Sequence, residues 1–161
     1  MCNSKKIISI CMLFFILTLV MGCNNSKKPE AYKVTIDTIN IVIPENFRKA
    51  EENENIISFN DNLNKVNIEK IKDIENFKID EELKKVKDEY KKENTDLVDV
   101  IFQKDVPKIH GLAGLNGTKT IHIYFIENGN TIIKITCNGD NDSSALVFRN
   151  IAKSAKVEPQ K

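Results

Sequence analysis

Hydrophobic residues follow three kinds of pattern along this chain, and each pattern predicts a different kind of segment. Residues 7–21 form one apolar run that only Ser9 and Thr18 interrupt. Further along, apolar and polar residues alternate in several short stretches, which is typical of β-strands. Two other stretches repeat apolar residues every three or four positions, which indicates amphipathic helices.

The alternating stretches predict short strands separated by polar turns. Ile39, Ile41 and Ile43 mark the first clear strand, which Pro44 ends. The polar residues 60–62 predict a turn between the next two strands. The predicted strands are 39–43, with an extended stretch before it from Tyr32, then 56–59, 66–71 and 97–103.

The strongest local signal is a β-hairpin over residues 118–138, because Asn128 and Gly129 lie between two β-rich runs. A two-residue turn at this point pairs Glu127 with Asn130. The same register places Tyr124 opposite Ile133, His122 opposite Ile135 and Thr120 opposite Cys137.

Both faces of this hairpin are largely apolar. One face carries His122, Tyr124, Ile126, Ile133, Ile135 and Cys137. The other carries Ile121, Ile123, Phe125 and Ile132, together with Lys134 and Thr136. A strand pair that is apolar on both sides needs a cover on both sides.

Two helices are predicted as these covers. Residues 80–93 form the first helix, with Asp80 as its N-cap and a buried stripe of Leu83, Val86 and Tyr90. Residues 142–155 form the second, with Asn141 or Asp142 as its N-cap. Its buried stripe comprises Ala145, Phe148, Ile151, Ala152 and Ala155.

Pro107 opens a glycine-bearing segment that we expect to be a loop. Gly111, Gly114 and Gly117 recur at every third position. A phosphate-binding loop would need a helix N-terminus after it, and none is predicted here. The glycines are therefore expected at turns and bulges beside the sheet, with His110 exposed in the same loop.

These elements predict one α+β domain over residues 32–158, built as an antiparallel β-sheet with helices on both faces, an α/β/α sandwich. The residues before this domain, 1–31, have the pattern of a leader followed by a polar linker. Lys5 and Lys6 precede the apolar run, which is 15 residues long, too short for the roughly 20 residues of a spanning helix.

The end of the apolar run resembles the signal of a bacterial lipoprotein. Gly22 stands directly before Cys23, and the aliphatic Val20 precedes Gly22 by two residues. The resemblance implies that residues 1–22 are a signal peptide and that Cys23 receives a lipid with acyl chains such as palmitate. The alternatives are an ordinary secretory signal or an uncleaved anchor, with Cys23 incidental.

Lipidation would place the domain on the extracytoplasmic face of the cell membrane. Two or more acyl chains anchor a protein stably, and the polar residues 23–31, with Pro29, would serve as a flexible tether. Heavy use of Ile, Lys and Asn suggests an AT-rich genome, as in low-GC Gram-positive bacteria.

Removal of the leader changes both the cysteine count and the charge. Cys2 and Cys11 leave with it and Cys23 carries lipid, so Cys137 is the one free thiol and no intrachain disulfide is expected. The mature chain keeps 22 basic and 23 acidic residues, a net charge of about −1. No basic excess is available to attract nucleic acid.

Candidate catalytic chemistry is sparse. His122 and Cys137 are diagonal neighbours in the predicted hairpin, so they could form a thiol–imidazole pair or half of a metal site. The alternative is a buried thiol beside a core histidine, because zinc needs four ligands and no third one is predicted. The acidic groups at Glu51, Glu52 and Glu54 and at Asp140 and Asp142 read as a polar turn and as helix capping. No catalytic residue, metal or cofactor is assigned.

The order of elements resembles the PsbP-like fold, named for an extrinsic protein of photosystem II and shared by a Ran-binding nuclear import factor. The resemblance rests on residues 43–47 (IPENF) after a strand, a helix between strands, a glycine loop before a long hairpin, and a final helix ending in residues 151–154 (IAKS). It implies an antiparallel sheet flanked by helices and used as a docking or accessory module.

The expected function follows from the leader and from the sparse chemistry. We expect a lipid-anchored, extracytoplasmic, non-catalytic binding or accessory protein of the cell envelope, with an unknown envelope protein as its partner. The alternative is an extracytoplasmic hydrolase or metal-dependent enzyme that uses His122 and Cys137.

Overall fold

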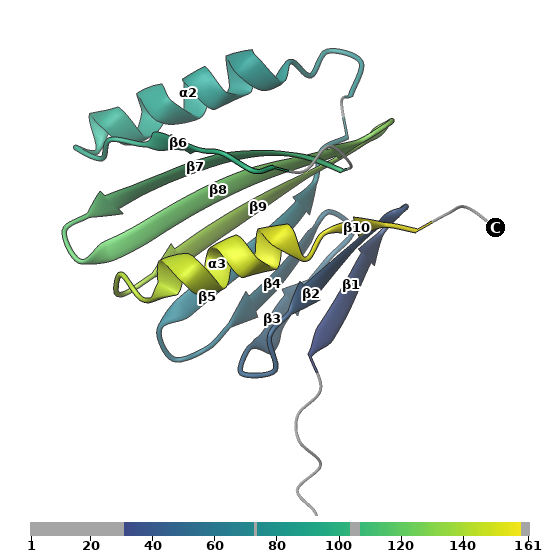
Figure 1. Ribbon diagram of the computed structural model, residues 1–161, viewed down its shortest axis with the longest axis horizontal. Helices are drawn as coiled ribbons and strands as arrows, with labels where there is room; N and C mark the ends of the chain where they lie inside the picture. The colour runs from purple at the N-terminus through teal and green to yellow at the C-terminus, as the bar shows by residue number, and fades with distance from the viewer. Residues whose placement is uncertain (1–30, 73, 104–106, 159–161) are drawn as a thin grey trace, which may run out of the picture.

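The computed structural model describes residues 31–72, 74–103 and 107–158 (Figure 1). The predicted signal peptide, the lipidation site at Cys23 and all but the last residue of the tether lie outside the described residues. The elements are β1 (Tyr32–Ile36), β2 (Ile39–Ile43), β3 (Arg48–Glu52), β4 (Ile56–Asn60), β5 (Asn64–Lys70), α2 (Ile79–Lys92), β6 (Val98–Val100), β7 (Lys108–Asn116), β8 (Lys119–Asn128), β9 (Thr131–Gly139), α3 (Ser144–Lys153) and β10 (Lys156–Val157).

The strands form two antiparallel sheets. The larger sheet has seven strands in the order β3-β4-β5-β9-β8-β7-β6, and the smaller has three in the order β1-β2-β10. For the described residues, the prediction of an antiparallel α+β fold with two helices is confirmed, whereas the prediction of a single sheet is wrong. Within the described parts of the chain, strands β1, β2 and β10 pair with one another and not with the larger sheet, because the chain leaves β2 at Pro44 and starts a new ladder at β3.

Strand β8 lies near the middle of the large sheet, and its alternating side chains divide the core. Ile121, Ile123 and Phe125 pack in one cluster with Val86 of α2. Tyr124 and Ile126 belong to a second, larger cluster that includes Phe148 and Ile151 of α3 and the three isoleucines Ile39, Ile41 and Ile43 of β2. Burial of one large apolar side chain stabilises the fold by roughly 1.5–3 kcal/mol. Because the second cluster contains more buried side chains than the first, it makes the larger contribution to stability.

The small sheet joins the two ends of the domain. β1 and β10 both pair with β2, one on each side. Just before β10, the Ser154 hydroxyl accepts a hydrogen bond of 2.8 Å from the backbone N–H of Val42. The start and the end of the described chain are therefore held together by backbone hydrogen bonds.

The hairpin of β8 and β9 forms where it was predicted, but with a different register. Asn128 pairs with Thr131, so Gly129 and Asn130 form the turn. Gly129 has a φ of +57°, which suits the first central position of a type II′ turn. Tyr124 therefore pairs with Ile135 and His122 with Cys137, two residues away from the predicted partners. A shift of two residues keeps every side chain on its predicted face.

Three segments differ from their predicted structure. The glycine-bearing segment is not a loop: β7 contains Gly111 and Gly114, and only Gly117 has the positive φ of a turn. Glu51 and Glu52, predicted to lie in a polar turn, belong to the edge strand β3, in which every residue is exposed. Residues 156–157, directly after the predicted second helix, form the short strand β10, which the pattern did not predict. Edge strands without a buried face carry no alternation, so the pattern misses them.

Both helices have the predicted stripes but not the predicted caps. Val86 is buried in α2, and Leu83 and Tyr90 are half-buried beside it. Lys78 occupies the N-cap position of α2 and Ser143 that of α3, and neither side chain makes a capping hydrogen bond. Within the described residues, neither helix has the length and the apolar character needed to cross a membrane.

Candidate functional site

The two residues selected from the sequence, His122 and Cys137, face each other across β8 and β9. They share the larger core cluster's face of the sheet with Tyr124. His122 Nδ1 lies 2.6 Å from the Tyr124 hydroxyl oxygen, and its ring packs edge-on to Phe148 of α3 with centroids 5.7 Å apart. The residues are thus in direct register rather than diagonal, and α3 covers them.

Burial favours the neutral forms of the three side chains in this group, His122, Tyr124 and Cys137. Cys137 is completely buried, and this burial raises the pKa of its thiol well above the ordinary value. Burial, with a smaller effect of the nearby Arg149 charge, lowers the pKa of His122 to about 4. Burial also raises the pKa of Tyr124. All three groups are neutral near pH 7, so the hydrogen bond between His122 and Tyr124 joins two uncharged groups and no thiolate is available as a nucleophile.

The other predicted chemical groups lie elsewhere. His110 is on β7, where its Nε2 lies 3.3 Å from a carboxylate oxygen of Glu127 without hydrogen-bond geometry. It is half-buried rather than exposed in a loop. Within the described parts of the chain, no three His, Cys, Asp or Glu side chains come together in a way that could hold a metal ion.

An aromatic side chain that the sequence did not single out lies next to Tyr124. Phe102 follows β6 and packs edge-on against the Tyr124 ring, with centroids 5.6 Å apart. Gly111, the cross-strand neighbour of Tyr124, leaves room for it. A Cβ atom at position 111 would lie 3.1 Å from the Phe102 ring and 3.0 Å from the Tyr124 ring. Glycine at this position therefore permits the close contact of the two rings.

Two basic residues of α3 border the same aromatic ring. The Arg149 guanidinium lies over Phe102, 5.8 Å from the ring centroid, and one of its N–H groups donates to the Ile101 carbonyl at 3.4 Å. Lys153 is one helical turn further on. Neither Arg149 nor Lys153 forms an ion pair with any residue that the structure describes.

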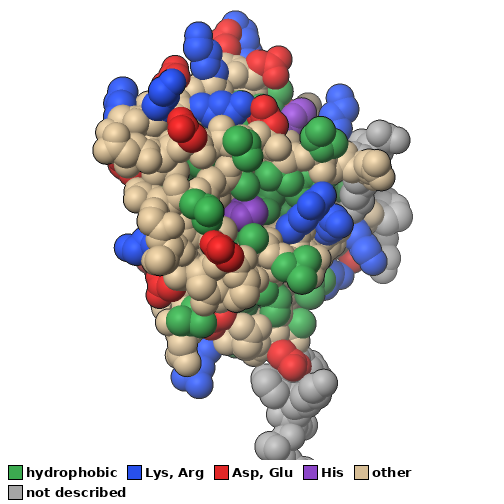
Figure 2. All heavy atoms as spheres, turned by 60° about the vertical axis from the view of Figure 1, so that its left-hand side comes forward, with side chains coloured by type: hydrophobic (Ala, Val, Ile, Leu, Met, Phe, Trp, Pro, Cys, Tyr) green, Lys and Arg blue, Asp and Glu red, His purple; other side chains and the backbone are tan. Residues whose placement is uncertain are grey.

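These side chains line an open groove between α3 and the segment after β6, with a cavity volume of about 730 Å³. Figure 2 shows a face on which hydrophobic side chains gather around a histidine, with basic side chains beside them. We call the open groove between α3 and the segment after β6 the α3 groove. Its lining residues are Ile101, Phe102, Gln103, Arg149 and Lys153.

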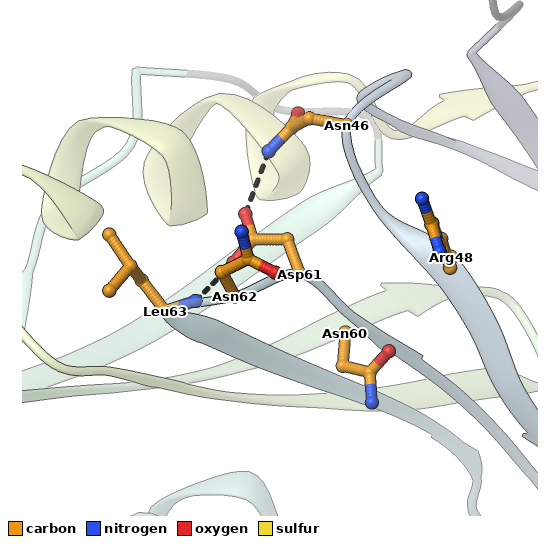
Figure 3. Close-up of a pocket in the computed structure, with 6 residues that line it drawn as sticks. All are labelled: Asn46, Arg48, Asn60, Asp61, Asn62 and Leu63. Carbon is orange, nitrogen blue, oxygen red and sulfur yellow. Dashed lines mark hydrogen bonds between the residues drawn. The ribbon is translucent and has the colours of Figure 1, made fainter.

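A second hollow of about 560 Å³ lies at the turn between β4 and β5 (Figure 3). Its central carboxylate, Asp61, accepts hydrogen bonds from the Asn46 side chain and from the backbone N–H groups of Leu63 and Asn64. It also accepts from the side chain of Asn64. Asp61 is therefore occupied in holding the turn, and this hollow is a weaker candidate than the α3 groove.

The sequence pattern contains a partial signal for the groove. Arg149 and Lys153 are four residues apart, on a side of the predicted helix away from its buried stripe of Phe148, Ile151 and Ala152. That spacing places two cations on one exposed face. The position of Phe102 beneath Arg149 depends on a contact between distant segments, which no local pattern reveals.

The comparison with protein-family models gives no match, and neither does the comparison with curated proteins. Solved structures with a similar fold include two from other organisms. The cyanobacterial PsbP protein CyanoP from Synechocystis sp. PCC 6803 has a TM-score of 0.60 at 10% identity, covering 85% of this chain and 98% of that one. The Ran-binding protein Mog1p from Saccharomyces cerevisiae has a TM-score of 0.54 at 11% identity, covering 80% and 95%. At these identities the likeness shows the fold alone, which is PsbP-like as the sequence predicted.

Proposed function

We propose that this protein is a lipid-anchored, extracytoplasmic, non-catalytic binding or accessory protein of the cell envelope, and that it binds its partner in the α3 groove. The anchor rests on the sequence: Gly22 and Cys23 end an apolar run that is preceded by two lysines. The partner is an envelope protein, and no cofactor takes part.

The observation that carries the binding function is the pairing of Arg149 with Phe102. A guanidinium held over an aromatic ring is a frequent feature of protein-binding surfaces, because Arg and aromatic residues dominate their energetics. Neither Arg149 nor Lys153 has an acidic partner among the described residues, so their charges remain available to a ligand. The groove thus offers a partner two positive charges that no carboxylate of the described residues pairs with.

The buried groups beneath the groove favour binding over catalysis. A hydrolase that uses Cys137 would need a thiolate close to an imidazole base, whereas this thiol is completely buried and its pKa is raised. No hydrogen bond joins Cys137 to His122 within the described structure, where the imidazole is held by Tyr124 instead. The buried side chains of His122, Tyr124 and Cys137 thus belong to the core, and the side chains that line the α3 groove are the ones that would contact a partner.

Two further considerations support an accessory module. The sequence predicts one helix on each face of the large sheet. The packing of Val86 and Phe148 in separate clusters, on alternate β8 side chains, supports this arrangement. The sheet edges and the grooves beside the helices would then remain as recognition surfaces. The fold also occurs in the Ran-binding protein Mog1p. Shared fold supplies analogy only, so the argument rests on the groove.

Site-specific photo-crosslinking in whole cells tests the proposal. A photoreactive amino acid replaces Gln103, which lines the groove, or Glu51, which lies on β3 at the opposite edge of the sheet. We expect a discrete protein adduct from position 103 that disappears when Arg149→Gln and Lys153→Gln are added, and no such adduct from position 51.

Two outcomes would contradict the proposed function. One is the absence of an adduct at position 103, or an adduct that does not depend on Arg149 and Lys153. The other is stoichiometric metal in the purified protein that is lost, together with an enzymatic activity, in His122→Ala. That second result would favour the enzyme centred on His122 and Cys137.

A further inference from the structure

The α3 groove contains two positive charges at a fixed spacing. Arg149 and Lys153 stand four residues apart on α3, which places their Cβ atoms about 6 Å apart on one side of the helix. The guanidinium uses one N–H group on the Ile101 carbonyl. Since arginine has five N–H donors, most of them remain free to form a two-pronged contact with a carboxylate.

Large apolar side chains lie on either side of these charges. Ile101 is 79% exposed on the wall opposite α3. Leu146 is 66% exposed and lies one turn before Arg149 on the same side of the helix. Exposed aliphatic side chains around a cationic centre suit a ligand that carries both charge and apolar surface.

We propose that the α3 groove binds a segment of a partner polypeptide in which acidic side chains alternate with bulky apolar ones. This inference rests on the proposed function and names the chemistry of its partner. One carboxylate of the segment pairs with the Arg149 guanidinium and a second with Lys153. The neighbouring apolar side chains cover Ile101, Phe102 and Leu146.

Other anionic partners fit the groove less well. Attraction to an anionic membrane usually takes a cluster of about four to eight basic residues, whereas the groove has two. Nucleic acid requires a broad basic surface, but 24 basic residues are balanced by 23 acidic ones in this chain. A small free carboxylate would leave Ile101 and Leu146 exposed to water. A polypeptide segment satisfies both the charged and the apolar parts.

Fluorescence anisotropy with short labelled peptides tests the inference on the full-length chain in a neutral detergent. The first peptide alternates Glu and Leu, the second has Gln in place of Glu, and the third has Ser in place of Leu. We expect the first to bind at least about tenfold more tightly than either of the others, because each comparison removes a charge-assisted or an apolar contact. Arg149→Gln with Lys153→Gln should remove this preference.

A matched control carries the same change in charge elsewhere. Lys84 and Lys91 are exposed on α2 and form no ion pair with the described residues. Lys84→Gln with Lys91→Gln should therefore bind the first peptide as the unmodified chain does. Amide chemical shifts should change at residues 101–103 and 149–153 when this peptide binds.

Several outcomes would overturn the inference. These are equal binding of the Glu and Gln peptides, binding that survives Arg149→Gln with Lys153→Gln, and binding of phosphatidylglycerol vesicles through the same two residues without any peptide preference. If the peptides fail while the crosslinked adduct at position 103 persists, the groove still binds a partner, but one of different chemistry. Loss of the adduct as well would remove the proposed function itself.

Discussion

His122 and Tyr124, two residues apart on β8, point to the same side of the sheet and join through a hydrogen bond of 2.6 Å between Nδ1 and the hydroxyl oxygen. Both side chains are buried, so each satisfies a polar group of the other that would otherwise be costly. This pair lies beneath the contact of Phe102 with Tyr124 and so connects the core to the α3 groove.

Tyr124→Phe should destabilise the protein by about 1–3 kcal/mol, because it leaves the His122 Nδ1 buried without its partner. Urea denaturation followed by circular dichroism measures this change. Tyr32→Phe is the matched control, since Tyr32 is 42% exposed and should change the free energy of unfolding little. Equal stability of both variants would mean that the hydrogen bond contributes nothing.

Stability should decrease between pH 6.5 and pH 4 through His122. Burial lowers the pKa of His122 from 6.5 to about 4, so the unfolded chain binds a proton more readily than the folded one across this range. The stabilising effect is complete above pH 6.5 and is lost as the pH falls to about 4. Its size is on the order of 3 kcal/mol.

His122→Asn should flatten this part of the pH profile. The denaturation midpoints of the unmodified protein and of His122→Asn are measured at intervals from pH 7 to pH 4. Both proteins have the same carboxylates, so the difference between their profiles is the contribution of His122. Parallel profiles would show that His122 does not titrate abnormally.

Cys137 should resist thiol reagents in the folded protein. The side chain is completely buried and its raised pKa keeps it protonated, so modification requires unfolding. Mass spectrometry of the peptide that contains Cys137 distinguishes it from the other cysteines. Prompt labelling before denaturant is added would contradict the structure at this position and favour the thiol–imidazole hypothesis.

Gly111→Ala should destabilise the fold by about 1–3 kcal/mol and displace the Phe102 ring, because the new Cβ would lie 3.0 Å from Val100 and 3.1 Å from Phe102. Urea denaturation and the ring proton shifts of Phe102 measure the two effects. At Gly117 a Cβ meets no atom within 4 Å, although φ is +63°. Gly117→Ala should therefore cost about 1 kcal/mol through the backbone alone and leave the Phe102 shifts unchanged.

Cys23→Ala should release the protein from the membrane fraction or stall its processing, because Cys23 is the predicted site of lipid attachment. Fractionation with immunoblotting measures both effects. Membrane retention together with normal cleavage would mean that something other than a lipid on Cys23 holds the protein.

The sequence predicted which residues share a face more accurately than which residues pair. The hairpin shows why: the period of two assigned Tyr124 and Ile135 to one face, and the actual register, shifted by two residues, leaves that assignment intact. A type I′ turn at Asn128 and Gly129 would need a positive φ at both residues, whereas only Gly129 of the two has one, and the dipeptide signal does not determine this.

Edge strands and the groove were beyond the reach of local patterns. β3 has no buried residue, and its pairing with β4 depends on residues outside the strand itself. The contact of Arg149 with Phe102 joins α3 to a segment before β7. Such features depend on how separate elements meet, whereas hydrophobic periodicity records only the burial of one element at a time.

The three-stranded sheet has a consequence for the order in which the molecule assembles. β2 receives its second neighbour, β10, only from the last described residues, and the Ser154 contact with Val42 spans 112 residues of chain. Contacts between such distant segments form late in folding, because a long loop must close before they become favourable. A chain that emerges from its N-terminus would hold β1 and β2 as an unfinished pair until α3 has packed. The small sheet is therefore complete only after the last described strand has joined β2.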